Sequence, residues 1–243
     1  LLISVMAANN EIGTIAPLAE IGKIAKRHGI LFHTDAAQAL GKIPLDVAAM
    51  GIDLLSAGAH KMYGPKGIGI LYLRGKNPRV KIPPLLYGGG QEEGLRGGTL
   101  NVPGIVGFGE ACELAGQEMV VEQRRILQLR ERLYAGLGQI ALVQGLKNIE
   151  LNGPATDRLA GNLNLSFMGV RGEALMGQLH DVAVSSGSAC TSGSSEPSYV
   201  IQALGLDKER AASSIRFCLG RFTTEEEIDH TIKRVIETVK KLR

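Results

Sequence analysis

The sequence predicts an α/β protein of two domains, and three observations support that prediction. Segments typical of strands and of helices alternate along the first third of the chain. Glycine is frequent, at 32 of 243 residues, and tryptophan is absent, as in α/β enzymes with many tight turns. A long helical pattern at residues 105–137 lies near the middle of the chain. We therefore place a domain boundary inside it, between residues 118 and 119.

The first predicted domain, residues 1–118, begins with an apolar strand at residues 1–8. A near-continuous apolar strand needs cover on both faces, as in a parallel sheet, and this start suggests that further sequence lies upstream. A helix is expected between Pro17 and Gly29, with Leu18, Ile21, Ile24 and Ala25 on one face. The remaining predicted elements are strands at 30–35, 52–57 and 67–73, a helical turn at 47–50, and a long loop at 77–103. A loop of that length in a compact domain is usually functional.

The second predicted domain, residues 119–243, is a smaller α+β domain. Strands are expected at 163–167, 182–184 and 215–219, and a helix at 173–180. The last helix has the clearest signals. Thr223 and Glu226 have the spacing of a capping box, and an apolar stripe follows at Ile228, Ile232, Val235, Ile236 and Val239.

The composition excludes several classes of protein. The net charge is +3, with Lys and Arg spread along the chain, so nucleic-acid binding is not indicated. No apolar run approaches the 18 or so residues of a membrane-spanning helix. The three cysteines are odd in number and far apart, which argues against a disulfide framework and a self-contained zinc site. Such usage fits a reducing compartment, either the cytoplasm or an organelle matrix in a eukaryote.

Asp35 and Lys61 are the strongest candidates for chemistry. Asp35 lies at the C-terminal end of one predicted buried strand and Lys61 just past the end of the next, and ligands of open α/β sheets collect at the carboxyl ends of strands. A lysine amine and a carboxylate suit pyridoxal phosphate (PLP), because the amine binds the aldehyde and the carboxylate pairs with the pyridinium nitrogen. Desolvation would supply the neutral amine that this chemistry needs. Spacing alone leaves open a buried structural ion pair or two unrelated polar residues.

Cys190 is the second strong candidate. From Ser185 to Ser198, seven of fourteen residues are Ser and two are Gly, a composition that cannot bury apolar surface. A thiol on such a polar loop is suited to carrying a group from one place to another, although an incidental exposed cysteine remains an alternative. Cys112 and Cys218, in apolar segments, are expected to be packing residues.

Six segments, in order along the chain, resemble cysteine desulfurases. These belong to the class V aminotransferase group of fold-type-I PLP enzymes, and the resemblance is closest to the iron–sulfur assembly branch. The segments run from the first ten residues to the last third of the chain: Ala8–Gly13, His33–Gln38, His60–Gly67, Arg96–Thr99, Ser185–Cys190 and Ser214–Phe217. The resemblance implies the C-terminal part of the PLP-binding large domain, followed by the small domain with the catalytic cysteine.

The resemblance also implies residue roles at the cofactor. Lys61 would be the Schiff-base lysine and Asp35 the pyridinium partner. Gln38 would bind the phenolic oxygen of the ring, with Asn10 beside that oxygen and the substrate carboxylate. His60 would contact the phosphate, and Thr99 would reach the phosphate of the cofactor in the neighbouring subunit of a homodimer. Considered alone, Asn10 reads as a turn residue, Gln38 as a surface amide, and Thr99 as uninformative.

For substrate and sulfur, the resemblance implies that Arg216 clamps the carboxylate of L-cysteine. Lys61 and Cys190 would be catalytic, with the Cys190 thiolate taking the sulfur as a persulfide while L-alanine leaves. The persulfide would pass to an iron–sulfur scaffold protein or another acceptor. Cys190 would then also be a candidate ligand of an iron–sulfur cluster shared with that scaffold.

Two departures from the family pattern limit this interpretation. Gly58 stands where family members often have a phosphate-binding serine, and the family's first hundred or more residues have no counterpart here. We therefore expect the 243 residues alone to bind PLP weakly and to show little desulfurase activity. Two other functions stay open: a selenocysteine lyase, and a truncated, non-catalytic module that carries sulfur or docks on a scaffold.

Overall fold

The computed structural model describes residues 1–139, 149–187 and 198–243. They form two compact units. Unit 1 comprises residues 1–7 and 16–119, and unit 2 comprises residues 8–15 and 120–243. Both units combine a β-sheet with helices, so the predicted α/β class is confirmed. Among the described helices, none has the length and apolar character needed to cross a membrane.

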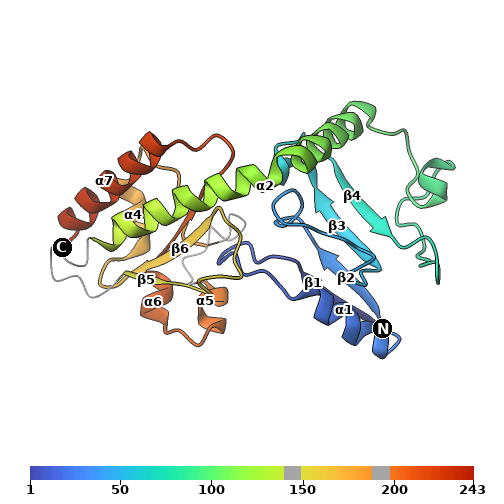
Figure 1. Ribbon diagram of the computed structural model, residues 1–243, viewed down its shortest axis with the longest axis horizontal. Helices are drawn as coiled ribbons and strands as arrows, with labels where there is room; N and C mark the ends of the chain where they lie inside the picture. The colour runs from blue at the N-terminus through green and yellow to red at the C-terminus, as the bar shows by residue number, and fades with distance from the viewer. Residues whose placement is uncertain (140–148, 188–197) are drawn as a thin grey trace. The chain divides into compact units, whose positions relative to one another are not determined.

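Unit 1 is built on a four-stranded sheet (Figure 1). The strands are β1 (Leu2–Met6), β2 (Leu31–Asp35), β3 (Leu54–Gly58) and β4 (Gly69–Leu73), and they lie side by side in that order. The first three run parallel, and β4 pairs antiparallel with β3. The carboxyl ends of β2 and β3 therefore lie at the same edge of the sheet.

Helix α1 (Leu18–Arg27) packs against β2. It begins directly after Pro17, and Gly29, with φ of +63°, follows its end. Leu18 and Ala25 are buried as predicted, whereas Ile24 is 48% exposed. Gly22 allows the helix to approach the turn at 47–51, because a Cβ at this position would lie 2.0 Å from the Met50 carbonyl oxygen.

The apolar first strand lies in a parallel arrangement, as predicted, but its apolar side chains are only partly covered by the described residues. β1 is an edge strand in the described chain, with Leu2 51% and Met6 41% exposed. Its apolar composition would suit an interior strand, but only β2 pairs with it among the described residues. An apolar strand with an unpaired edge is a surface on which further polypeptide can pair.

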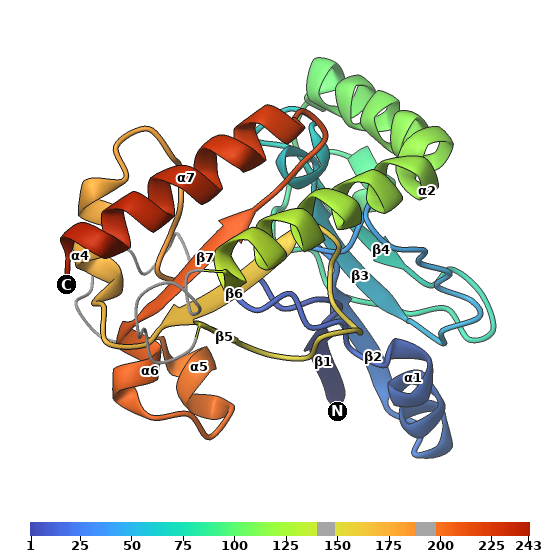
Figure 2. The ribbon, with the colours of Figure 1, turned by 60° about the vertical axis from the view of Figure 1, so that its left-hand side comes forward.

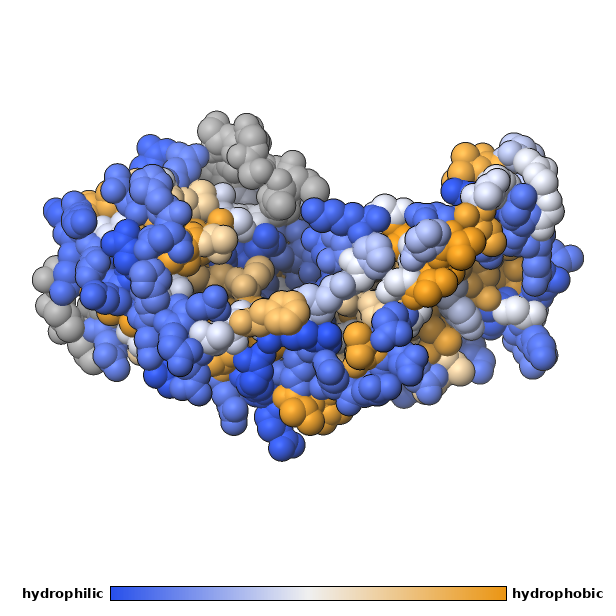
Figure 3. All heavy atoms as spheres, turned by 90° about the horizontal axis from the view of Figure 1, so that it is seen from above, coloured by the Kyte–Doolittle hydropathy of each residue, from blue (hydrophilic) through white to orange (hydrophobic). Residues whose placement is uncertain are grey.

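The chain between β4 and the long helix is mostly irregular, as predicted. It contains the short 3₁₀ helix η2 (Gln91–Gly94) and exposes large apolar side chains such as Leu85 and Tyr87. The helix that follows, α2 (Val102–Gly138), exposes Val102 and Val106 near its start. Apolar side chains, drawn in orange, gather on the part of unit 1 that Figure 3 shows.

The first part of α2 belongs to unit 1 and the rest to unit 2. In unit 1, Phe108, Ala111 and Ala115 of α2 pack against Ala59 and Met62. The latter two residues are the ends of η1 (Ala59–Met62), the 3₁₀ turn that directly follows β3. This small core fixes the position of η1.

Unit 2 contains an antiparallel sheet of three strands in the order β5 (Ile149–Leu151), β6 (Asn162–Phe167) and β7 (Ser214–Cys218). Along β6 the apolar residues Leu163, Leu165 and Phe167 alternate with polar residues. The apolar ones join a core with α2, α4 (Gly172–Gln178) and α7 (Glu225–Lys241). These helices cover one face of the sheet (Figure 2).

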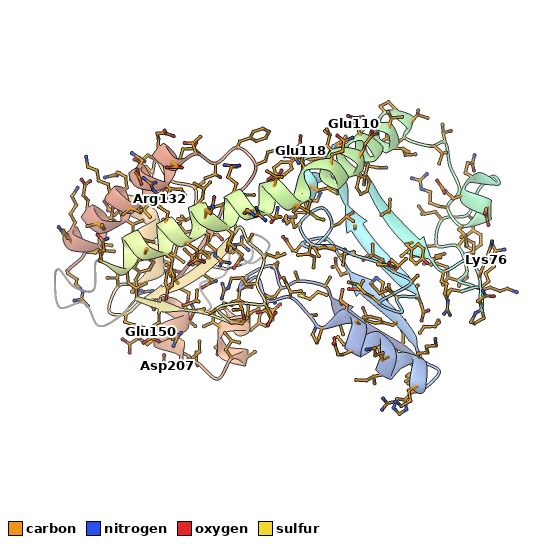
Figure 4. All side chains as sticks on the ribbon, viewed as in Figure 1. Lys76, Glu110, Glu118, Arg132, Glu150 and Asp207 are labelled. Atoms are coloured by element: carbon orange, nitrogen blue, oxygen red, sulfur yellow. The ribbon has the colours of Figure 1, made fainter. Side chains whose placement is uncertain are left out.

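The short helices α5 (Tyr199–Ala203) and α6 (Lys208–Ala212) lie away from α7, on the other side of the sheet (Figures 1 and 2). Figure 4 shows the same division in the side chains. Arg132 lies on the α7 side, where it pairs with Asp229, whereas Glu150 and Asp207 lie on the side of α5 and α6. Asp207 is the N-cap of α6.

Several predicted details of unit 2 are wrong. The capping box of α7 is one residue later than predicted, because Thr224 and Glu227 form it. Residues 182–184 form no strand, since only Ser185 bridges to β7, at Arg216. Cys112 and Cys218 are both exposed and are therefore not packing residues in the described chain.

Candidate active-site residues in the two units

Asp35 and Lys61 reach the same edge of the unit 1 sheet from two neighbouring strands. Asp35 is the last residue of β2 and stands opposite Ser56 in the β2–β3 register. Lys61 lies in η1, which begins immediately after β3 ends. Because β2 and β3 are parallel, both functional groups follow the carboxyl ends of strands, where ligands bind in open α/β sheets.

Neither group forms a salt bridge with any residue that the structure describes. One oxygen of Asp35, Oδ1, accepts a hydrogen bond from the backbone N–H of Ala37 at 2.8 Å. Among the described residues, the other oxygen and the Lys61 amine have no hydrogen-bond partner, so the alternative of a structural ion pair is not supported. Both side chains are exposed. The described residues therefore do not bury the Lys61 amine, although burial was expected to favour its neutral form.

Gln38 and His60 follow the same two strands. Gln38 is half-buried in the turn after β2, and His60 is exposed on η1 beside Lys61. Gly58 ends β3 in extended conformation, with φ of −125°. Among the described residues, a Cβ at Gly58 would meet the His60 ring alone, at 3.5 Å, which is ordinary contact. The backbone therefore has room for the serine that the family pattern leads us to expect there.

Thr99 lies exposed in the long loop of unit 1. The loop before it is shaped by a close approach of two glycines, since a Cβ on Gly97 would lie 2.6 Å from the backbone nitrogen of Gly88. The Gly97 N–H donates to the Leu86 carbonyl at 2.9 Å, and Gly98 donates to the Gln91 side chain at 3.2 Å. These bonds define the backbone that leads to Thr99.

In unit 2, the segment 8–15 makes a tight turn around Asn9. The Asn9 side-chain oxygen accepts from the N–H groups of Glu11 and Ile12, at 2.9 and 3.0 Å. Asn10 itself lies in this turn, as its residue type alone suggests, and the Asn9 side chain caps the turn. Gly13 has φ of +73°, and a Cβ there would lie 2.7 Å from the Asn162 side chain. A residue with a side chain at position 13 would therefore be strained and crowded.

Arg216 and Asn10 are brought together within unit 2. The Arg216 Nη1 donates to the Asn10 carbonyl at 2.6 Å. The Nε atom of Arg216 is buried and has no partner among the described residues. The contact with Asn10 and the pairing of β7 with β6 hold the half-buried guanidinium, which keeps donors for a planar anion such as a carboxylate.

The polar face of the unit 2 sheet was not foreseen. Asn164, Ser166 and Ser214 are fully buried there, and the Asn152 side-chain amide donates to all three. The alternation of polar and apolar residues over 162–167 is the signal that could have revealed it. Glu11, which is 2% exposed, lies in the same region, with its carbonyl accepting from the Asn164 amide.

The remaining candidate, Cys190, lies outside the described residues. The described chain ends before it at Gly187 and resumes at Ser198, the N-cap of α5. Among the residues that are described, no group of three or more His, Cys, Asp and Glu side chains could hold a metal ion. The predicted cluster-ligand role of Cys190 stays a prediction.

The side chains of unit 1 fit PLP in their chemistry. A cofactor with an aldehyde, a pyridinium nitrogen and a phosphate needs a free amine, a carboxylate and polar donors. Lys61 and Asp35 provide the first two at one edge of the sheet, and no described residue competes for either group through a salt bridge. The fold and these residues thus define an α/β protein that presents a lysine and a carboxylate beyond the ends of parallel strands.

Comparisons with known proteins identify the family. The model of the aminotransferase class-V family matches residues 1–231. The chain therefore belongs to the aminotransferase class-V family. It is 57% identical over all 243 residues to the cysteine desulfurase IscS of Anaeromyxobacter sp. (strain Fw109-5), and 53% identical over 242 residues to the human cysteine desulfurase. It spans 59% of the length of the first relative and 52% of the second.

Solved structures show the same fold. A NifS-like protein superposes with a TM-score of 0.87 at 38% identity, covering 100% of this chain and 62% of that protein. A NifS-like protein from Rickettsia africae superposes with a TM-score of 0.84 at 31% identity, covering 98% and 62%. The predicted similarity to cysteine desulfurases is confirmed, whereas the roles of individual residues stay predictions.

Proposed function

We propose that this chain is the C-terminal part of a PLP-dependent cysteine desulfurase, which takes sulfur from L-cysteine and releases L-alanine. The observation that carries the proposal is the placement of Lys61 and Asp35. Both follow the carboxyl ends of adjacent parallel strands, and neither is engaged in a salt bridge with a described residue. The high identity to proteins named cysteine desulfurases supports the choice of substrate.

The roles at the cofactor are those that the resemblance implies, and the placement of Lys61 and Asp35 supports them. When bound, PLP would supply an electron sink for the substrate carbanion. Lys61 would hold the cofactor covalently and then move the Cα proton of the substrate. The Asp35 carboxylate would keep the proton on the pyridinium nitrogen. Gln38 would donate to the phenolic oxygen, and His60 would donate to the phosphate, where Gly58 offers no side-chain donor.

The roles at the substrate belong to residues of unit 2. Arg216 would bind the carboxylate of L-cysteine, and the Asn10 carbonyl would orient its guanidinium through their hydrogen bond. The Cys190 thiolate would attack the substrate sulfur. The Cβ–S bond of the substrate would break as the S–S bond of a Cys190 persulfide forms. Its electron pair would stay with Cβ, which would take up a proton, and the carbon fragment would leave as alanine.

The partners are proposed from the family and from the surface. Exposed apolar residues of unit 1, such as Leu85, Tyr87 and Val106, support a homodimer in which Thr99 would serve the neighbouring subunit. The persulfide would pass to an iron–sulfur scaffold protein or another acceptor, with Cys190 as the candidate cluster ligand. The cysteine usage is compatible with a reducing compartment, such as the cytoplasm.

The proposal is tested on a fused chain, in which residues 1–243 follow the N-terminal segment of the Anaeromyxobacter relative. We expect this protein, with PLP and L-cysteine, to form alanine and a persulfide on Cys190, detected by peptide mass spectrometry. Cys190→Ser should stop persulfide formation, whereas Cys112→Ser, which removes an exposed thiol, should leave it intact. Alanine formation that depends on Cys112 instead would refute the assignment of the nucleophile. Release of selenium from selenocysteine without activity on cysteine would favour a selenocysteine lyase.

A further inference from the structure

Glu11 is a buried carboxylate to which the proposed reaction assigns no role. Glu11 is only 2% exposed, and its carboxylate forms no salt bridge within the described part of the chain. Removing a carboxylate from water without a cationic partner costs stability. Buried groups that lower stability in this way are expected mainly at functional sites. The contacts of Glu11 indicate what it does.

The Glu11 carboxylate binds the start of helix α5. The hydroxyl of Ser198 donates to Glu11 Oε2 at 2.5 Å. The same hydroxyl accepts from the N–H groups of Val200 and Ile201, at 3.2 and 3.3 Å, as the N-cap of α5. Glu11 therefore orients the capping hydroxyl and anchors the first turn of α5.

The same carboxylate packs against Gly187. A Cβ at this position would lie 3.4 Å from Glu11 Oε2, so the Gly187 backbone lies next to the carboxylate. Gly187 and Ser198 are the described residues on either side of 188–197, the stretch of sequence that contains Cys190. One carboxylate thus contacts both ends of that stretch.

Glu11 is itself held in place by its backbone. Its N–H donates to the Asn9 side chain at 2.9 Å. Its carbonyl accepts from the side-chain amides of Asn162 and Asn164 on β6, at 3.1 and 3.2 Å. The preceding residue, Asn10, binds Arg216 through its carbonyl. The anchor is therefore tied to the strands that carry the proposed substrate-binding arginine.

We propose that Glu11 is a positioning residue that holds the two ends of the Cys190 segment in place for sulfur transfer. The inference rests on the proposed function and deepens it, because it names a group that acts through Ser198 and Gly187 and not on substrate. Small displacements of a reacting group can cost as much as about a hundredfold in rate. Loss of the anchor should therefore slow the step at Cys190 and leave substrate binding intact.

The first test measures the anchor itself on the 243-residue chain by amide hydrogen exchange. Glu11→Ala should speed exchange of the α5 amides, Tyr199–Ala203, by about tenfold, because local opening becomes easier. Asp207→Ala is the matched control, since it removes the N-cap of the neighbouring helix α6 and should leave α5 unchanged. Equal protection of the α5 amides in the wild type and in Glu11→Ala would refute the inference that Glu11 anchors α5.

The second test measures single-turnover persulfide formation on Cys190 in the fused chain. Glu11→Ala should be about tenfold slower, with the KM for L-cysteine within about twofold of the wild type. Glu11→Gln keeps an acceptor oxygen for Ser198 and should stay within about threefold of the wild-type rate. Ser198→Ala should slow persulfide formation as much as Glu11→Ala does. The double variant should be no slower than either single variant, because each of them removes the same Ser198–Glu11 hydrogen bond.

A wild-type rate in Glu11→Ala, or additive losses in the double variant, would overturn the inference. If the wild-type fused chain forms no persulfide, the proposed function fails and the positioning role fails with it. The exchange experiment then shows separately whether the Glu11 anchor exists. Should Glu11→Ala fail to fold, Ser198→Ala and Glu11→Gln are used instead, both for the hydrogen exchange of α5 and for the rate of persulfide formation.

Discussion

At the residue scale, Asp35 and Gln38 differ in what they would supply to the same ring. Asp35 carries a charge that would favour a protonated pyridinium nitrogen, whereas Gln38 offers one neutral hydrogen bond. We expect Asp35→Ala to lose more activity than Gln38→Ala, since leaving one hydrogen-bond partner unsatisfied costs about 1–3 kcal/mol, or roughly 5- to 150-fold in rate. Alanine formation by the fused chain measures both. Equal residual rates would contradict the electron-sink role of Asp35.

Gly58 offers a gain-of-function test at the residue scale. The backbone there is extended, with φ of −125°, and a Cβ would make only ordinary contact with the His60 ring. We expect Gly58→Ser to fold as stably as the wild type and to tighten PLP binding several-fold, because the hydroxyl adds a phosphate donor. Fluorescence titration with PLP checks the affinity. Gly22→Ser is the contrasting variant, since a Cβ there would clash with the Met50 carbonyl. Unchanged affinity in a stable Gly58→Ser protein would place the phosphate elsewhere.

Residues differed in how far the sequence could predict their place. Asp35 and Lys61 were found because each directly follows an apolar strand, so sequence position determines the edge at which they emerge. The sequence identifies Glu11 only as a member of the segment Ala8–Gly13. Its burial depends on Ser198 and on two asparagines of β6 that are distant in sequence, and no local pattern reports such contacts.

At the element scale, a side-chain cluster links the end of the α4 region to α7. The carboxylate of Asp181 accepts from Arg234 and from His230, both on α7, each at 2.8 Å. Hydrogen bonds from Arg234 and then His230 lower the pKa of Asp181 from 3.8 to about 2. The pKa is depressed in the folded state, so this contribution to stability is present above about pH 4 and is lost as the pH falls towards 2.

We therefore expect Asp181→Asn to lower the melting temperature at pH 5, and the difference from wild type to vanish by about pH 2. Thermal unfolding of the chain at several pH values checks this. Asp157→Asn is the control, since Asp157 is an exposed carboxylate of unit 2 with no side-chain bond to a described residue. A difference from wild type that grows as the pH falls would contradict the account of Asp181.

Elements were predicted well where they are long or strongly periodic. The helical pattern at residues 105–137 corresponds to α2, and the apolar stripe of the last helix faces the unit 2 core. The capping box moved by one residue because Thr223 and Thr224 offer the same chemistry, and only Thr224 reaches the N–H of Glu227. The strand β5 and the helices α5 and α6 are too short, at three and five residues, for periodicity to reveal them.

At the scale of the whole molecule, the two units differ in how well their sheets are covered. The unit 2 sheet packs against three helices around a core that includes Leu133, Leu165 and Val239. Unit 1 exposes Leu2 and Met6 on one edge strand and Ile70 and Leu71 on the other. The predicted domain division at residues 118 and 119 stays a prediction, and the structure places residues 8–15 with the later unit.

We expect unit 2 to be the more stable unit of the isolated chain. In hydrogen exchange, the amides of β6 and β7 should be the slowest, and those of β1 and β4 should be much faster, because edge strands with exposed apolar faces open easily. Limited proteolysis followed by mass spectrometry should give cleavage in unit 1 first. Protection of β1 equal to that of β6 would contradict this difference between the units.

Chemical trapping of the cofactor shows whether Lys61 is the residue to which PLP is attached. The fused chain is incubated with PLP, reduced with borohydride and digested, and the labelled peptide is located by mass spectrometry. We expect label on Lys61, loss of that label in Lys61→Ala, and its retention in Lys23→Ala, which changes an exposed lysine of α1. Stoichiometric label on another lysine, with Lys61 unmodified, would show that Lys61 is not the attachment site.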